Sequence, residues 1–163
     1  MSKVEIIGPY FFEDQNEQAV TVTSERYVAM LKEFVFPYLE ENEYDIPSIW
    51  FQQDGATAHT AKDSMNVLSE KFPKRLISRF GGVSWPPRSP DLSSCDFFLW
   101  GYLKSKVYIG KPRTISELKN AIRREIASIS IEKLKNVMIN FKHRLQECVA
   151  EQGRHLSNIV FHN

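Results

Sequence analysis

The segment that decides the fold reads Ile49-Trp50-Phe51-Gln52-Gln53-Asp54-Gly55-Ala56-Thr57-Ala58-His59. Its first part is short, apolar and bounded by Pro47 and Gly55, a pattern typical of a buried strand, which we expect over residues 48–53. Asp54 stands at the carboxyl end of that strand, where ligand sites collect in α/β sheets. Such an aspartate could face a metal ion and a substrate together, or it could start a turn or cap the next helix.

Hydrophobic periodicity on both sides of this segment predicts a mixed α/β domain with a helical C-terminal half. The expected strands are residues 4–12, 19–23, 48–53 and 75–79. The expected helices are one capped by Thr23 or Ser24, residues 60–72, one from Leu92, one behind the capping box Thr114-Ile115-Ser116-Glu117, and one from Ser130 to Gly153. Residues 80–90 hold Gly81-Gly82 and three prolines, so they predict a loop.

The composition fits one globular domain, because 163 residues with 42% apolar and 12% aromatic side chains supply a core. It excludes an intrinsically disordered chain. No stretch of about 18 apolar residues predicts a membrane span, and the start lacks an apolar run typical of a secretory signal. The only cysteines, Cys95 and Cys148, argue against a disulfide scaffold and suit a reducing compartment.

The net charge of +1 conceals an uneven distribution along the chain. Residues 1–53 carry three basic and ten acidic side chains, a net charge of −7. Residues 54–112 and 113–163 each carry nine basic and five acidic side chains, a net charge of +4 each. The basic part permits contact with phosphates, although an excess of this size is equally typical of a solvated surface.

A second candidate segment reads Trp85-Pro86-Pro87-Arg88-Ser89-Pro90-Asp91-Leu92-Ser93-Ser94-Cys95-Asp96-Phe97-Phe98-Leu99-Trp100. Asp96 lies in the expected first turn of a helix, three residues beyond a possible Ser93 cap. An acid there also favours the helix dipole, by about 0.3–1 kcal/mol, without any further role. Asp91 could equally be a turn residue. Periodicity alone does not decide which of the two acids faces a site.

The segments 53–59 and 85–92 closely resemble the catalytic domain of Tc1/mariner-type transposases, which are DDE/D endonucleases with an RNase H-like fold. Residues 7–14, Ile-Gly-Pro-Tyr-Phe-Phe-Glu-Asp, and residues 100–104, Trp-Gly-Tyr-Leu-Lys, are similar to insect-type members of that family. The resemblance covers nearly the whole chain and rests on two motifs in the right order. It implies metal-dependent DNA strand cleavage and joining at transposon ends, in the nucleus.

By this resemblance, Asp54 matches the second catalytic acid and Asp96 the third, whereas Asp91 belongs to the Ser-Pro-Asp-Leu motif and is expected to be structural. The choice between Asp91 and Asp96 stays open at this point. The resemblance implies that Asp54 and Asp96 hold Mg²⁺, or Mn²⁺, for two-metal phosphodiester chemistry. Mg²⁺ prefers oxygen ligands and keeps several waters, so a few carboxylates are enough to bind it.

The family's first acid lies on the first strand of the sheet, upstream of the segment similar to residues 8–12. Glu5 is the only acid before that segment, and it matches nothing catalytic. We therefore expect residues 1–112 to form a truncated, incomplete RNase H-like core, with a mixed sheet that lacks its first strands. Residues 113–163 would be a helical extension. Such a chain is expected to bind metal weakly and to cleave no DNA alone.

Two other functions remain open. The chain could be a non-catalytic remnant that binds DNA or another protein, with a homodimer as one possibility. It could also act on RNA hybrids, although the Ser-Pro-Asp-Leu motif argues for a transposase. Metal titration distinguishes the first alternative, because DNA binding by a remnant would depend on salt but not on metal.

Further side chains are candidates for nucleic-acid contact: His59, Arg88, Lys104 and Lys106. Each has a structural alternative, because His59 could make a local hydrogen bond and the lysines could be merely solvated. We expect Trp85 to pack under its loop. Cys95, Cys148, His143 and His155 lack zinc-ligand spacing.

Overall fold

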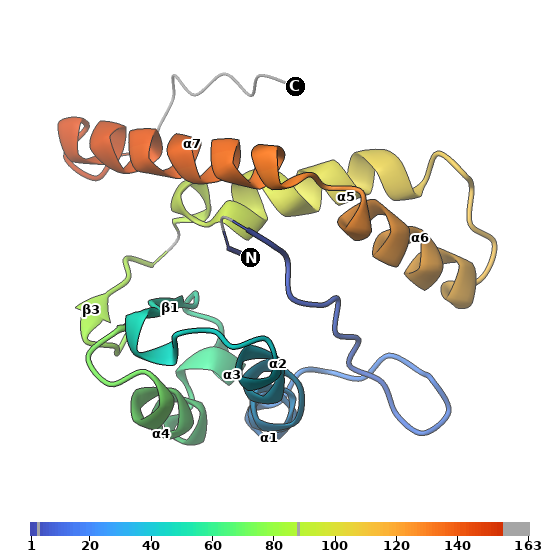
Figure 1. The fold of residues 1–163 in the computed structure, drawn as a ribbon, viewed down its shortest axis with the longest axis horizontal. Helices are drawn as coiled ribbons and strands as arrows, with labels where there is room; N and C mark the ends of the chain where they lie inside the picture. The colour runs from blue at the N-terminus through green and yellow to red at the C-terminus, as the bar shows by residue number, and fades with distance from the viewer. Residues whose placement is uncertain (3, 88, 155–163) are drawn as a thin grey trace. The chain divides into compact units, whose positions relative to one another are not determined.

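The computed structural model describes residues 1–2, 4–87 and 89–154. It divides into two compact units, each treated separately below (Figure 1). The sheet unit is Tyr10–Arg88, and the helical unit combines Met1–Pro9 with the chain from Ser89 onward. The content of strands and helices confirms the predicted α/β class. The expected division at residue 112 stays a prediction.

The sheet has three short strands, β1 (Phe51–Gln52), β2 (Leu76–Ser78) and β3 (Val83–Ser84), in the order β1-β2-β3. Both neighbouring pairs are parallel, with Phe51 opposite Leu76 and Ile77 opposite Val83. The predicted α/β class stands, but the strands of this sheet within the described residues are all parallel rather than mixed. The predicted strands at 48–53 and 75–79 are confirmed in position, although both are shorter than expected. The 3₁₀ turn η2 (Ile46–Ser48) occupies the beginning of the first and delays β1.

Strand β3 lies inside the segment 80–90 that we predicted to be a loop, so that prediction is wrong for its middle. The chain turns back closely after β2, where Gly81 N donates to Ser78 O at 3.1 Å and Trp85 N donates to the same oxygen at 3.0 Å. A Cβ on Gly81 would lie 2.3 Å from Leu76 O. The tight return to β2 therefore depends on the missing side chain of Gly81.

Substitution of Gly81 by alanine should lower the free energy of unfolding by about 2 kcal/mol, because its Cβ would collide with the backbone of β2. Urea denaturation measures the change. Gly101 in α5 (Trp100–Val107) is the matched control, since a Cβ there meets nothing within 4 Å. Gly101→Ala should leave stability unchanged or raise it. Equal effects at both positions would contradict this account of the turn.

The predicted strands at 4–12 and 19–23 are wrong. In this described part of the chain, pairing is limited to one antiparallel bridge between Glu13 and Ala19, with Val20 N donating to Phe12 O at 3.0 Å. The segment 4–12 is divided between the two units after Pro9 and cannot act as one strand. Pro9 also has no N–H to donate to a ladder.

The helices of the sheet unit begin with α1 (Ser24–Met30), which continues through the π-turn η1 (Leu31–Val35) into α2 (Phe36–Glu41). Thr23 caps α1 as predicted, since its side chain accepts from Arg26 N. The helix predicted over 60–72 is found as α4 (Lys62–Lys71), which starts later than expected because Ala61 before it is extended at ψ 148°. The short α3 (Thr57–Thr60) precedes it and was not expected. Phe72 is fully buried and stacks on Phe51 of β1, with ring centroids 5.1 Å apart.

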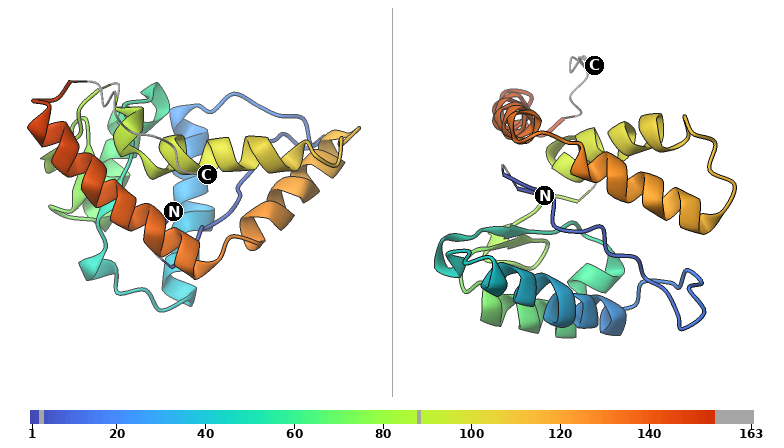
Figure 2. Two further views of the ribbon diagram at one scale, coloured as in Figure 1. Left: turned by 90° about the horizontal axis from the view of Figure 1, so that it is seen from above. Right: turned by 45° about the vertical axis from the view of Figure 1, so that its right-hand side comes forward.

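The helical unit starts with the 3₁₀ turn η3 (Pro90–Leu92) and the π-turn η4 (Cys95–Leu99). It continues with α5 (Trp100–Val107), α6 (Ile115–Ala127) and α7 (Ile131–Ala150) (Figure 2). Its core consists of apolar side chains from these elements and their connections: Leu99, Leu103, Val107, Ala121, Ile129 and Leu134. Among the described helices, none combines the length and the hydrophobicity that a membrane span requires.

The predicted starts of α6 and α7 and the predicted end of α7 are confirmed, whereas the start of the helix expected from Leu92 is not. Thr114 accepts a hydrogen bond from Glu117 N at 3.1 Å, and the Glu117 carboxylate accepts one from Arg113 N at 2.7 Å. Ser130 caps α7 through Lys133 N. Gly153 ends it at φ +79° and donates to Cys148 O. The Ser93 cap is different, because η4 starts after Ser94 without a side-chain cap.

Candidate metal site

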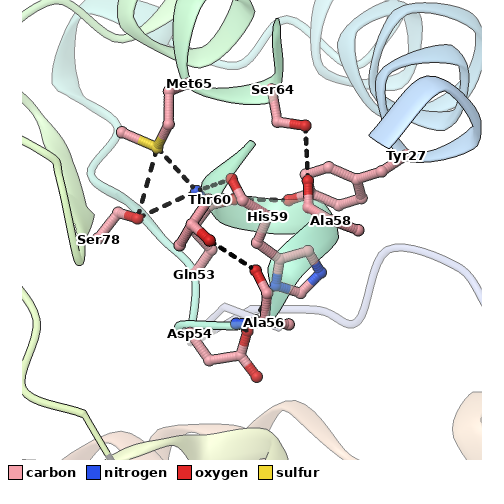
Figure 3. Close-up of polar contacts among 10 residues, drawn as sticks. All are labelled: Tyr27, Gln53, Asp54, Ala56, Ala58, His59, Thr60, Ser64, Met65 and Ser78. Carbon is pink, nitrogen blue, oxygen red and sulfur yellow. Dashed lines mark hydrogen bonds and ion pairs between the residues drawn. The ribbon is translucent and has the colours of Figure 1, made fainter. Parts of the chain in front are cut away.

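The candidate site is built on a buried glutamine at the end of β1. Gln53 is 6% exposed, and its amide connects several elements of the sheet unit (Figure 3). Its Oε1 accepts from the Tyr27 hydroxyl of α1 at 2.9 Å, and its Nε2 donates to His59 O at 2.9 Å and to Ser78 Oγ of β2 at 3.1 Å. The residue before Asp54 is therefore held from three sides.

Asp54 follows directly and turns its carboxylate outward, with 55% of the side chain exposed. Its Oδ1 accepts from Ala56 N at 3.0 Å and lies 2.5 Å from His59 Nδ1. A carboxylate oxygen only accepts, so His59 Nδ1 carries the hydrogen in this contact. The other oxygen points away from the side chains drawn in Figure 3. Asp54 begins the turn through Oδ1 and at the same time leaves Oδ2 exposed. The role of a turn residue and the role of a metal ligand are therefore compatible for this residue.

Tyr27 connects the two parts of this arrangement. Its ring packs on the His59 ring, with centroids 4.4 Å apart and a tilt of 39°. Burial, and secondarily the negative charge of Asp54, raise the pKa of the Tyr27 hydroxyl far above its usual range. The hydroxyl is therefore protonated at neutral pH and can donate to Gln53.

The two acids of the second segment have different surroundings in the helical unit. Asp96 is exposed in the first turn of η4, and its N–H donates to Ser93 O at 2.9 Å. Asp91 is half-buried in η3, and its carbonyl oxygen accepts from an Arg144 Nη at 3.3 Å. The main chain at Asp91 is thus hydrogen-bonded to a side chain of α7, whereas the Asp96 side chain is exposed to solvent.

Arg144 of α7 is 3% exposed and holds this segment in place. Its Nε donates to Asn140 Oδ1 at 2.6 Å, and its guanidinium lies 4.3 Å from the centre of the Phe97 ring. Burial lowers the pKa of Arg144, while the charges of Asp91 and Glu147 act in the opposite direction. The buried guanidinium therefore links α7 to the turns on both sides of Ser93.

The other predicted contact residues are distributed over the chain. Lys104 and Lys106 lie exposed in the last turn of α5, whereas His59 contacts Asp54 as described above. Arg88 lies outside the described residues. Trp85 is 9% exposed, which confirms the prediction that it packs inward. The assignment of Lys104, Lys106 and Arg88 to nucleic-acid contact stays a prediction.

The donor chemistry of Asp54 and Asp96 fits a hard divalent cation, since each presents an exposed carboxylate. Within the ranges that the structure describes, no three His, Cys, Asp or Glu side chains gather as a metal-binding group. Magnesium sites commonly combine one or two carboxylates with substrate phosphates and waters. Each of these two acids, taken by itself within its own unit, could therefore supply one carboxylate oxygen to a metal ion that phosphate and water otherwise hold.

The parallel sheet, the flanking helices and the helical second unit define an α/β fold of the incomplete RNase H-like type, as predicted. Solved structures with this fold include the Mos1 transposase catalytic domain with raltegravir and manganese, at a TM-score of 0.70 and 22% identity, and with raltegravir and magnesium, at 0.68 and 21%. The crystal structure of the catalytic domain of Mos1 mariner transposase matches at 0.67 and 19%.

Each of these matches covers 85% of this chain and 66–67% of the Mos1 chain. No protein-family model matches the sequence, and no curated protein does. The likeness confirms, at the level of the fold, the resemblance to a mariner catalytic domain that the motifs indicate.

Sequence reasoning missed the buried polar residues behind the two acids. In the sequence, Gln53 stands out only as part of the motif at 53–59, and Tyr27 only as one residue of the helix expected after Thr23 or Ser24. The available signal was polarity at a core position, since Gln53 follows an apolar strand and Arg144 lies on the inward face of α7. Ser78 gives no such signal in the sequence, because its hydroxyl meets Gln53 only once β2 has paired with β1.

Proposed function

We propose that this chain is part of a Tc1/mariner-type transposase catalytic domain that engages DNA with the help of Mg²⁺ or Mn²⁺. The observation that carries the proposal is the exposed Asp54 carboxylate at the carboxyl end of β1, anchored through Oδ1, in a chain with the fold of the Mos1 catalytic domain. Mos1 catalytic-domain structures contain manganese or magnesium.

In this proposal Asp54 and Asp96 provide the carboxylate ligands, and Asp91 is structural. The exposure of Asp96 and the attachment of Asp91 to Arg144 support that choice. When bound, the metal would supply charge neutralisation at a DNA phosphate and activation of an attacking hydroxyl or water. Lys104 and Lys106 would add sequence-independent attraction to phosphates.

The first acid of the family's set matches no residue of this sequence, so we expect weak metal binding and no strand cleavage by this chain alone. The DNA phosphate would then be an important ligand. Metal affinity should accordingly rise when duplex DNA is added. A nicking assay that shows cleavage lost in Asp54→Ala would disprove the expected inactivity.

The test is a Mn²⁺ titration of the full chain, with and without duplex DNA, followed by paramagnetic broadening of the Gly55 and Phe97 amide signals. Asp54→Asn should raise the Mn²⁺ concentration needed for half-maximal broadening at Gly55 about tenfold. A tenfold loss of affinity corresponds to roughly 1.4 kcal/mol. Asp96→Asn should do the same at Phe97.

Asp63→Asn is the matched control, because Asp63 is an exposed acid in the first turn of α4. It should leave both signals as in the wild type. Undiminished broadening at Gly55 in Asp54→Asn would refute the metal site. DNA binding that weakens with salt but ignores Mn²⁺ would instead support a non-catalytic DNA-binding module.

A further inference from the structure

The contact between His59 and Asp54 has a specific geometry. Both side chains belong to the sheet unit, where the imidazole Nδ1 lies 2.5 Å from Asp54 Oδ1. The same Oδ1 accepts the Ala56 N–H at 3.0 Å. Two N–H groups thus converge on one carboxylate oxygen, and the other oxygen is left to a ligand (Figure 3).

The His59 ring is itself held in place. Only 28% of its side chain is exposed, and it packs on Tyr27 at 4.4 Å between ring centroids. The backbone of the same residue is fixed as well, because its carbonyl oxygen accepts from Gln53 Nε2 at 2.9 Å. The imidazole is therefore a rigid donor rather than a mobile surface group.

We propose that His59 is a positioning residue, which holds the Asp54 carboxylate in one rotamer and directs Oδ2 outward as the metal-binding oxygen. This inference rests on the proposed metal role of Asp54. It assigns to His59 a role through Asp54 rather than a direct phosphate contact, which was one of the two possibilities that the sequence left open for this residue. Partners that orient a ligating group typically change metal affinity by 10–100-fold when they are removed.

The matched variants are His59→Asn and His59→Leu. The asparagine Nδ2 stands at the position of the histidine Nδ1 and can donate to Asp54, whereas leucine of nearly the same size cannot. Both lose the ring contact with Tyr27, so their difference isolates the N–H donor. In the Mn²⁺ titration, His59→Leu should weaken broadening at Gly55 about tenfold, while His59→Asn stays within about twofold of the wild type.

A second measurement needs no metal. Three-bond couplings between the Asp54 carboxyl carbon and its backbone report the χ1 rotamer, which should be single in the wild type and in His59→Asn and averaged in His59→Leu. A wild-type affinity in His59→Leu, or an Asp54 rotamer that does not change there, would overturn the positioning role. If the wild type shows no Mn²⁺ broadening but the Asp54 couplings behave as expected in all three proteins, the metal site is refuted. The orientation of the Asp54 carboxylate by His59 is then still supported.

Discussion

Gln53→Leu is expected to lower the free energy of unfolding by about 3–4 kcal/mol, because it removes the partner of three buried or half-buried polar groups. These are the Tyr27 hydroxyl, the Ser78 hydroxyl and the His59 carbonyl. Ser78 keeps only a weak contact with Met65 Sδ at 3.7 Å. Leucine has a similar size, so lost hydrogen bonding rather than a cavity would cause the effect. Urea denaturation at constant m-value measures it.

Gln52→Leu is the control for this prediction, because Gln52 is the exposed neighbour in the same strand. It should change stability by less than about 0.5 kcal/mol. Tyr27→Phe combined with Gln53→Leu should cost less than the sum of the two single substitutions, since the double variant leaves no Tyr27 hydroxyl unpaired. If Gln53→Leu lowers the free energy of unfolding no more than Gln52→Leu does, the hydrogen bonds of Gln53 do not stabilise β1.

Arg144→Met should lower the free energy of unfolding by about 3 kcal/mol, through loss of charge-assisted hydrogen bonds and the contact with Phe97. The bonds concerned join the guanidinium to Asn140 Oδ1 and to Asp91 O. Methionine retains an apolar stem of similar length, so the packing of α7 is largely preserved. Amide exchange over residues 91–99 should accelerate as well, because these turns lose their link to α7.

Lys142→Met controls for charge and helix position, since Lys142 is exposed on the same helix. Its expected effect is below about 0.5 kcal/mol. Arg144→Lys keeps the charge but not the planar fork of donors, so it should recover only part of the lost stability. Unchanged exchange at residues 91–99 in Arg144→Met would contradict the proposed link, even if global stability falls.

Local patterns predicted the ends of several elements correctly. Thr23, Thr114 and Ser130 each accept the backbone N–H group three residues further on, so their role depends on nearby residues alone. The strand before Asp54 was likewise indicated by Pro47, Gly55 and the apolar residues between them. These features could be predicted because short-range sterics and hydrogen bonding decide them.

The predictions that failed required long-range pairing. The expected strands at 4–12 and 19–23 have suitable residues, but in the described structure they pair no further than the hydrogen bond from Val20 N to Phe12 O beside the bridge of Glu13 and Ala19. The first segment is shared between two units, so it cannot pair as one strand. Conversely, Val83 and Ser84 form a strand in a proline- and glycine-rich segment because β2 offers them a partner. Strand propensity specifies a possibility, and the neighbouring strand decides whether it is realised.

The candidate site follows the same division. The sequence by itself determined that Asp54 ends a strand and that Asp96 lies in the first turn of a helix, since both depend on local pattern. Only the tertiary structure decided how Gln53 is held, because Tyr27 and Ser78 lie 26 and 25 residues away along the chain. Arg144 and Asp91 are separated by 53 residues. Contacts of this kind form when packed elements bring polar groups together out of water, where each must find a partner.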